Sequence, residues 1–187
     1  VDNFTLTGIE IETLQDGGFH LRQQKFVDQL ELMSLSQRRS RTDTDKLTPG
    51  ELTQLRGVSG SANWLANQTR PDLCVSTSLL QGAHASATVA DTREANKLIR
   101  LCRQHAHVPI RVSPIPLEDL TFVGFGDCGW GVRRDGSSQG GSLIIAADKR
   151  ILDGFEATTT MVDWKSYKCK RVVRSSLAGE TQAYVET

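Results

Sequence analysis

One segment, residues 120–131 with the sequence LTFVGFGDCGWG, constrains the fold of this chain more than any other. Its alternation predicts a β-strand in which Phe122 faces one side of a sheet, and Val123 and Phe125 face the other. Because both faces are apolar, we expect this strand to be central and buried on both sides. Asp127 comes at the end of the predicted strand.

The surrounding patterns divide the chain into strand-like ends and a helical middle. Alternation around an Asp-Gly turn predicts an N-terminal hairpin, helical spacing follows over 26–35, and a polar stretch predicts a linker at 36–47. Two sets of segments complete the prediction: helices beginning at Thr48, Pro71 and Asp91, then strands over 109–113, 118–130, 140–147 and 161–171, with a last helix from Ser175. The C-terminal order of three strands and a helix predicts an α+β fold with an antiparallel hairpin sheet and a helix on one face.

Helix caps are predicted at three places. Thr48, Pro49 and Glu51 form the pattern of a capping box with proline at the first helical position. Asp91 is the expected cap of the third helix, and Ser176 is a possible cap of the last one.

Two carboxylates are candidates for chemistry. Asp127 is flanked by glycines that let a ligand or another backbone come close, although an aspartate that starts a turn explains it as well. If Ser176 caps the last helix, Glu180 shares one face with Leu177 and Tyr184, which predicts a carboxylate on an apolar stripe. The alternative for Glu180 is a favourable charge near a helix N-terminus.

A basic cluster lies between these carboxylates. On a pair of strands, such a cluster would form a cationic face for phosphate groups. The alternative is an edge strand that lysines protect from pairing with other chains. The cluster consists of Lys165, Lys168, Lys170, Arg171 and Arg174, interleaved with Trp164 and Tyr167.

Composition excludes several classes of protein. The chain has 22 basic and 22 acidic residues, so any nucleic-acid surface must arise from local clustering. Its four cysteines form no C-x-x-C pair, which argues against a zinc knuckle or a disulfide scaffold and fits a reducing compartment. No apolar run is long enough to span a membrane, and no signal peptide is apparent, so we expect neither a membrane protein nor a secreted one.

Several short stretches, in order, resemble the Pol polyprotein of copia-type LTR retrotransposons. They are TGIEIE at 7–12, LTQLRGVSGSANWLANQTRPDL at 52–73, GFGDCGWG at 124–131, RRDGSSQGG after it, and VDWKSYKCKRVVRSSLAGETQAY at 162–184. The first stretch resembles a strand that follows the family's polymerase active site, and the second resembles its segment with Y-R-x-x-V-G-S-L and T-R-P-D. The third and fourth resemble Y-S-D-A-D-W-A-G and the loop R-R-S-T-S-G that follows it. The last resembles S-W-x-S-K-K followed by S-S-T-E-A-E-Y.

The resemblance implies roles for two residues. Asp127 matches the first catalytic aspartate of the family's RNase H domain, and Glu180 matches the catalytic glutamate of its first helix. In an intact parent these carboxylates would hold two Mg²⁺ ions with others and cleave the RNA of an RNA–DNA hybrid. The sequence departs from the family at Gly129 and Ala178, where the family has an aspartate and a glutamate outside those two catalytic positions.

The resemblance also implies a domain organisation. Residues 1–113 would be the C-terminal, mainly helical thumb and connection region of a reverse transcriptase, and 114–187 an incomplete RNase H-like domain. The family's Y-V-D-D motif and its third RNase H aspartate are absent from the sequence, so we expect a fragment with little activity of its own. Implied partners are nucleic acid, in particular RNA–DNA hybrid, and the rest of the polyprotein, in a cytoplasmic virus-like particle or the nucleus.

Three functions stay open at this point. The chain is a segment of an enzyme that needs its flanking regions, a non-catalytic nucleic-acid-binding or structural remnant of a decayed or co-opted element, or an unrelated two-domain binding protein.

Overall fold

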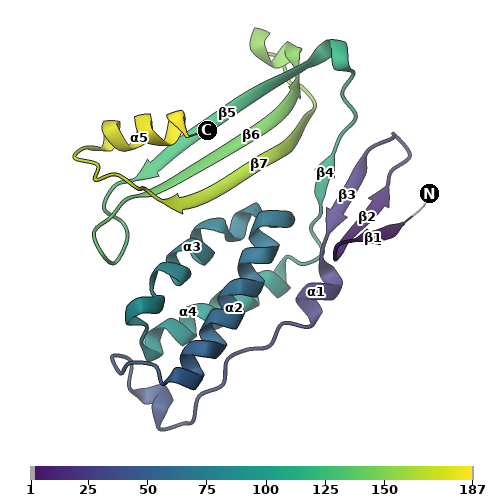
Figure 1. The fold of residues 1–187 in the computed structure, drawn as a ribbon. Helices are drawn as coiled ribbons and strands as arrows, with labels where there is room; N and C mark the ends of the chain where they lie inside the picture. The colour runs from purple at the N-terminus through teal and green to yellow at the C-terminus, as the bar shows by residue number, and fades with distance from the viewer. Residues whose placement is uncertain (1–2, 187) are drawn as a thin grey trace. The chain divides into compact units, whose positions relative to one another are not determined.

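The computed structural model describes residues 3–186 and has an α+β fold, as the sequence predicts. Within these residues are two antiparallel sheets and five α-helices (Figure 1). The chain divides into two compact units, one formed by Val1–Arg22 with Pro109–Thr187 and the other by Gln23–Val108. This division differs from the predicted boundary at 113–114, because a strand that follows the helices pairs with the N-terminal hairpin.

The first sheet grows from the predicted hairpin. Its turn is closed by a hydrogen bond from the Leu14 N–H to the Gly18 carbonyl, and Gly17 adopts a φ of 83°, which glycine tolerates without strain. The sheet order is β1-β2-β3-β4. The strands are β1 (Phe4–Leu6), β2 (Ile9–Thr13), β3 (Phe19–Arg22) and β4 (Ile110–Val112).

The helical unit contains four α-helices around one apolar core. Leu55, Leu65, Leu73 and Ile99 are fully buried in it. The helices are α1 (Gln24–Asp28), α2 (Pro49–Gln68), α3 (Cys74–Gly82) and α4 (Val89–Gln104), with short 3-10 turns at Arg39–Arg41, Pro71–Leu73 and His84–Ser86.

Local capping begins the two longest helices. Thr48 caps α2 in the predicted capping box, in which its N–H donates to Glu51 at 2.8 Å. The Arg39 guanidinium, and then this Thr48 N–H, lower the pKa of Glu51 to about 2. For α4 the prediction is wrong by three residues: Thr88 is the cap, and Asp91 accepts the Thr88 N–H from the third helical position.

The segment after α1 is extended rather than helical. The apolar spacing over 26–35 predicts a helix, but α1 ends at Asp28. Leu30 and Met33 are nevertheless buried, because the Asn96 side chain bonds both the N–H and the carbonyl of Met33, at 2.8 and 2.9 Å. A side-chain amide thus replaces the backbone partner that a helix would have supplied.

Arg70 is the main polar connection inside the helical unit. Its side chain is almost fully buried, donates to both carboxylate oxygens of Asp72 at 2.8 and 2.7 Å, and donates to the carbonyls of Leu101 and Cys102 in the last turn of α4. These carbonyls have no partner within their own helix, so Arg70 satisfies them and joins the end of α2 to the end of α4.

The second sheet carries the segment 120–131. Its order is β5-β6-β7, so β5 is an edge strand among the described residues rather than the predicted central one. Phe122 and Phe125 are accordingly 61% and 52% exposed. The elements are β5 (Leu120–Gly129), β6 (Gln139–Asp148), β7 (Thr159–Lys168) and α5 (Ser176–Val185), with 3-10 turns at Leu117–Asp119 and Lys149–Asp153.

Replacing Arg70 with alanine should destabilise the helical unit by about 2–4 kcal/mol, because it leaves two buried helix-end carbonyls without a donor. Arg100→Ala is the matched control, since Arg100 is exposed on α4 and should cost no more than about 0.5 kcal/mol. Urea unfolding followed by helical circular dichroism measures both. Equal midpoints for the two variants would contradict the role assigned to Arg70.

Candidate functional site

Helix α5 lies along β5 at a distance that only glycine permits (Figure 1). A Cβ atom on Gly126 would lie 2.8 Å from the Tyr184 backbone nitrogen, and one on Gly179 would lie 2.7 Å from the Cys128 sulfur. The helix therefore contacts β5 through Gly126 and Cys128, and uses its own Gly179–Ala183 stripe to do so.

Asp127 points away from this helix. Successive side chains of a strand face opposite sides, and both neighbours of Asp127 in the strand, Gly126 and Cys128, contact α5. Asp127 pairs in register with Gly141, is exposed, and accepts a hydrogen bond from the Cys128 N–H at 2.8 Å. Its side chain is thus exposed on the face of β5 opposite to α5.

Glu180 lies on the solvent side of α5. Ser175, not Ser176, caps this helix, since its hydroxyl accepts the Ala178 N–H at 3.2 Å. The predicted apolar stripe of Leu177, Glu180 and Tyr184 is wrong: all three are exposed, and Tyr184 is 70% exposed. The buried stripe consists of small residues instead.

Asp127 faces the side of β5 opposite to α5, and Glu180 is exposed on α5 itself. Over residues 3–186, moreover, no three histidine, cysteine, aspartate or glutamate side chains are grouped as a metal site would require. The Mg²⁺ ions that the family resemblance implies stay a prediction for the intact parent, and we derive no metal-dependent step from these residues.

Two members of the basic cluster already have partners. Lys165 donates to the Glu186 carbonyl at 2.6 Å and lies 5.8 Å from the centre of the Tyr167 ring. Lys168 forms an ion pair with Asp135, and this lysine, followed by Ser137, holds the pKa of Asp135 well below its usual range. Because strand side chains alternate, Lys165 and Lys168 lie on opposite faces of β7 and do not form the predicted cationic face.

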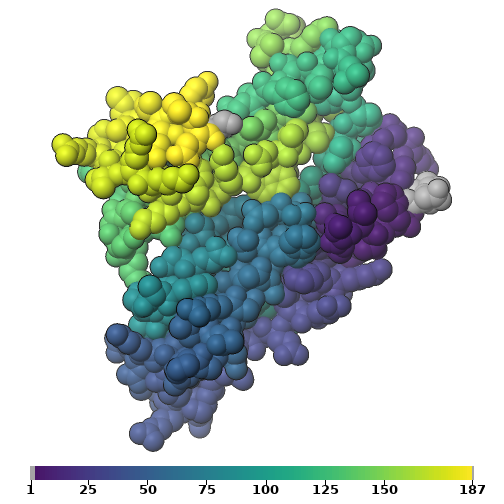
Figure 2. Space-filling model, in the orientation of Figure 1, coloured from purple at the N-terminus to yellow at the C-terminus, as the bar shows by residue number. Residues whose placement is uncertain are grey.

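The other three basic residues lie in the loop between β7 and α5, residues 169–175, which we call the basic loop. Lys170, Arg171 and Arg174 are exposed and have no hydrogen-bond or ion-pair partner among the described residues. Figure 2 shows the chain between β7 and α5 at the molecular surface. Three unpaired cations within five residues are a local concentration of charge on a chain that is neutral as a whole.

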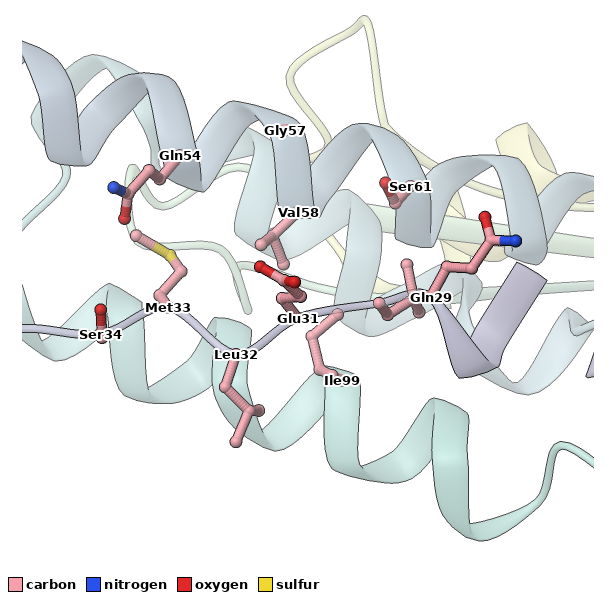
Figure 3. A pocket seen from close by; sticks show the side chains of 11 residues that line it. Gln29, Glu31, Leu32, Met33, Ser34, Gln54, Gly57, Val58, Ser61 and Ile99 are labelled. Carbon is pink, nitrogen blue, oxygen red and sulfur yellow. The ribbon is translucent and has the colours of Figure 1, made fainter. Parts of the chain in front are cut away.

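The helical unit contains a groove with a volume of about 440 Å³ (Figure 3). It lies between α2 and the extended segment 29–34, and Figure 3 shows the side chains of Glu31 and Met33 directed toward α2. Its walls combine apolar side chains such as Val58 and Ile99 with neutral polar groups and one carboxylate, that of Glu31.

No family model, no curated protein and no solved structure matches this chain. The family resemblance of the short motifs therefore stays a prediction. In the part of the chain that the structure covers, residues 3–186, no helix is both long and apolar enough to cross a membrane.

A methyl group at Gly126 should loosen α5 from the sheet. We expect Gly126→Ala to cost about 1–3 kcal/mol, because the added Cβ meets helix backbone that cannot rotate away. Gly141→Ala in β6 is the matched control: its Cβ would meet only the Lys165 carbonyl, at an ordinary 3.8 Å. Thermal unfolding compares the two variants, and equal melting temperatures would contradict the close contact between α5 and β5.

Proposed function

We propose that this chain is a segment of a copia-type Pol polyprotein, in which the tail of a reverse transcriptase is joined to the first part of an RNase H domain. Within this segment, the basic loop binds the sugar-phosphate backbone of nucleic acid, with RNA–DNA hybrid as the natural partner. The proposal assigns hydrolysis, and the Mg²⁺ it requires, to the intact parent polyprotein and not to these residues. The virus-like particle or the nucleus would be its location.

Two features support the family assignment. The motifs T-R-P-D, G-D-x-x-W-G and S-S-x-x-x-E occur in the family's order. The elements β5, β6, β7 and α5 follow one another as three antiparallel strands and a helix, and Asp127 is on the first strand while Glu180 is on the helix. In the motif T-R-P-D, Arg70 and Asp72 pair with each other, so this motif serves the packing of the helices.

The observation that carries the binding function is the unpaired state of Lys170, Arg171 and Arg174. A cation without a protein partner breaks no hydrogen bond or ion pair within the protein when it contacts a phosphate, and the contact releases counterions from the nucleic acid. Lys165 and Lys168 would have to leave the Glu186 carbonyl and Asp135 first. We therefore assign the main phosphate contacts to the three loop residues and expect Lys165 and Lys168 to contribute less to binding.

A structural remnant without nucleic-acid binding is the second candidate. It is favoured by the position of Lys165 and Lys168 on β7, at one end of the sheet order, where charged side chains prevent pairing with another chain. The two candidates differ in whether the loop cations affect binding to a hybrid.

Salt dependence tests the binding role of the basic loop. The triple variant Lys170→Ala, Arg171→Ala and Arg174→Ala should flatten the slope of log affinity against log salt by about 2–3 for an RNA–DNA hybrid, because each lost phosphate contact contributes nearly one. Fluorescence anisotropy at several salt concentrations measures the slope.

The matched control removes the same charge from the helical unit. Arg38, Arg41 and Arg100 are exposed and unpaired among the described residues, and their triple alanine variant should keep the original slope. If both variants change the slope equally, the effect is one of net charge and the loop is not the contact site. An unchanged slope in the loop variant leaves only edge protection.

Catalysis gives the negative prediction. The 187-residue chain, incubated with a labelled hybrid and Mg²⁺, should release no more RNA fragments than buffer does, because no three carboxylate, histidine or cysteine side chains are grouped to hold a metal in residues 3–186. The Asp127→Asn variant is measured beside it on a denaturing gel. Cleavage that disappears in this variant would show that the segment is active by itself and that Asp127 is catalytic.

A further inference from the structure

Two cysteines that are far apart in the sequence meet beside α5. Cys128 in β5 and Cys169, the first residue after β7, have their sulfur atoms 3.8 Å apart. Both are present as free thiols, and they are 8% and 4% exposed. Cys169 is held here by its N–H, which donates to the Ser138 carbonyl at 3.0 Å.

The surroundings of this pair are almost entirely apolar. Cys128 and Cys169 form a cluster with Ala183, and Tyr167 and Val173 pack against it. Within this cluster the two thiols contact each other. Nothing in the cluster lies between the sulfur atoms to keep them apart.

We propose that Cys128 and Cys169 are a redox-sensitive dithiol that forms an intramolecular disulfide by exchange with a low-molecular-weight disulfide, such as oxidised glutathione. The inference rests on the geometry of the cluster and not on the proposed function.

The exchange balances in two steps. The Cys169 thiol loses its proton, and the thiolate attacks one sulfur of oxidised glutathione, which forms a mixed disulfide and releases one glutathione thiolate that takes up a proton. Cys128 then attacks the Cys169 sulfur and releases the second glutathione in the same way. The protein loses two electrons and two protons, and one oxidised glutathione becomes two reduced ones.

The distance between the sulfurs permits this bond after a small movement. A disulfide needs about 2.0 Å, so the sulfur atoms must approach by roughly 1.8 Å. Cys169 begins the basic loop, in which Val172 is 92% exposed, so the loop residues that must shift with Cys169 are not packed in a core. Burial, and then the hydrogen bond with Cys128, raise the pKa of Cys169 to about 11, so at neutral pH Cys169 rests as a thiol and reacts when the loop opens.

A disulfide at this position would fasten the basic loop. Trp130 already holds its middle, since the indole N–H donates to the Val173 carbonyl at 3.0 Å. The new bond would tie the start of the loop covalently to β5, so the local unfolding that lets a protease bind the backbone around Lys170 and Arg171 becomes rarer. Oxidation should therefore slow tryptic cleavage within the loop.

The test uses the full chain in glutathione buffers of graded oxidised-to-reduced ratio. Free thiols are then alkylated under denaturing conditions and mapped by peptide mass spectrometry. We expect a cross-linked Cys128–Cys169 peptide in oxidising buffer that disappears on reduction, while Cys74 and Cys102 in the helical unit stay alkylated. Trypsin should cut after Lys170 and Arg171 roughly tenfold more slowly in the oxidised chain.

Variants separate this bond from other effects of oxidation. Cys169→Ser should abolish both the cross-link and the protection from trypsin, and Cys74→Ser should preserve both. The proposal is overturned if the wild-type chain shows only alkylated Cys128 and Cys169 at every buffer ratio. It is equally overturned if glutathione adducts accumulate on them without a cross-link, or if the cross-link forms and loop cleavage is unchanged.

Discussion

The close contact between α5 and β5 is the constraint on which the functional features of this protein depend. It requires residues without side chains at Gly126 and Gly179, and it leaves room for the small sulfur of Cys128 between them. Once this face of β5 is occupied by the helix, strand alternation turns Asp127 to the other face. The same contact buries Cys128 and leaves Glu180 exposed to solvent, so the orientations of all three residues depend on how α5 packs against β5.

The helical unit is organised by a different principle. Its apolar core is supplemented by side chains that satisfy backbone groups of irregular segments and helix ends. Arg70 does this at the end of α4, and Asn96 does it for Met33 in the extended segment after α1. Such buried polar contacts specify which segments lie together, because an unsatisfied carbonyl or amide in a core costs more than the bond itself contributes.

Under the proposed function, local charge is what this chain would offer to a nucleic acid. The chain is neutral overall, yet Lys170, Arg171 and Arg174 stand without partners in one loop, whereas Lys165 and Lys168 are occupied. That loop begins at Cys169, so its mobility and the state of the dithiol are linked by the covalent chain. The proposed phosphate contact and the proposed dithiol exchange would therefore both involve the short segment between β7 and α5.

Features that depend on neighbouring residues could be predicted without the fold: the hairpin with its Asp16-Gly17 turn, the capping box of α2, and the order of three strands and a helix at the C-terminal end. It also indicated Asp127, Glu180 and the basic cluster as candidates, whose catalytic roles and family stay predictions. Only the tertiary structure decided that β5 is an edge strand, that Glu180 faces solvent, and that Cys128 meets Cys169 across 41 residues. The exposure of Glu180 and the meeting of the two cysteines depend on which face of α5 contacts the sheet, and the apolar Leu177 and Tyr184 predict the wrong face. The glycines that permit the contact carry no side chain whose periodicity would reveal it.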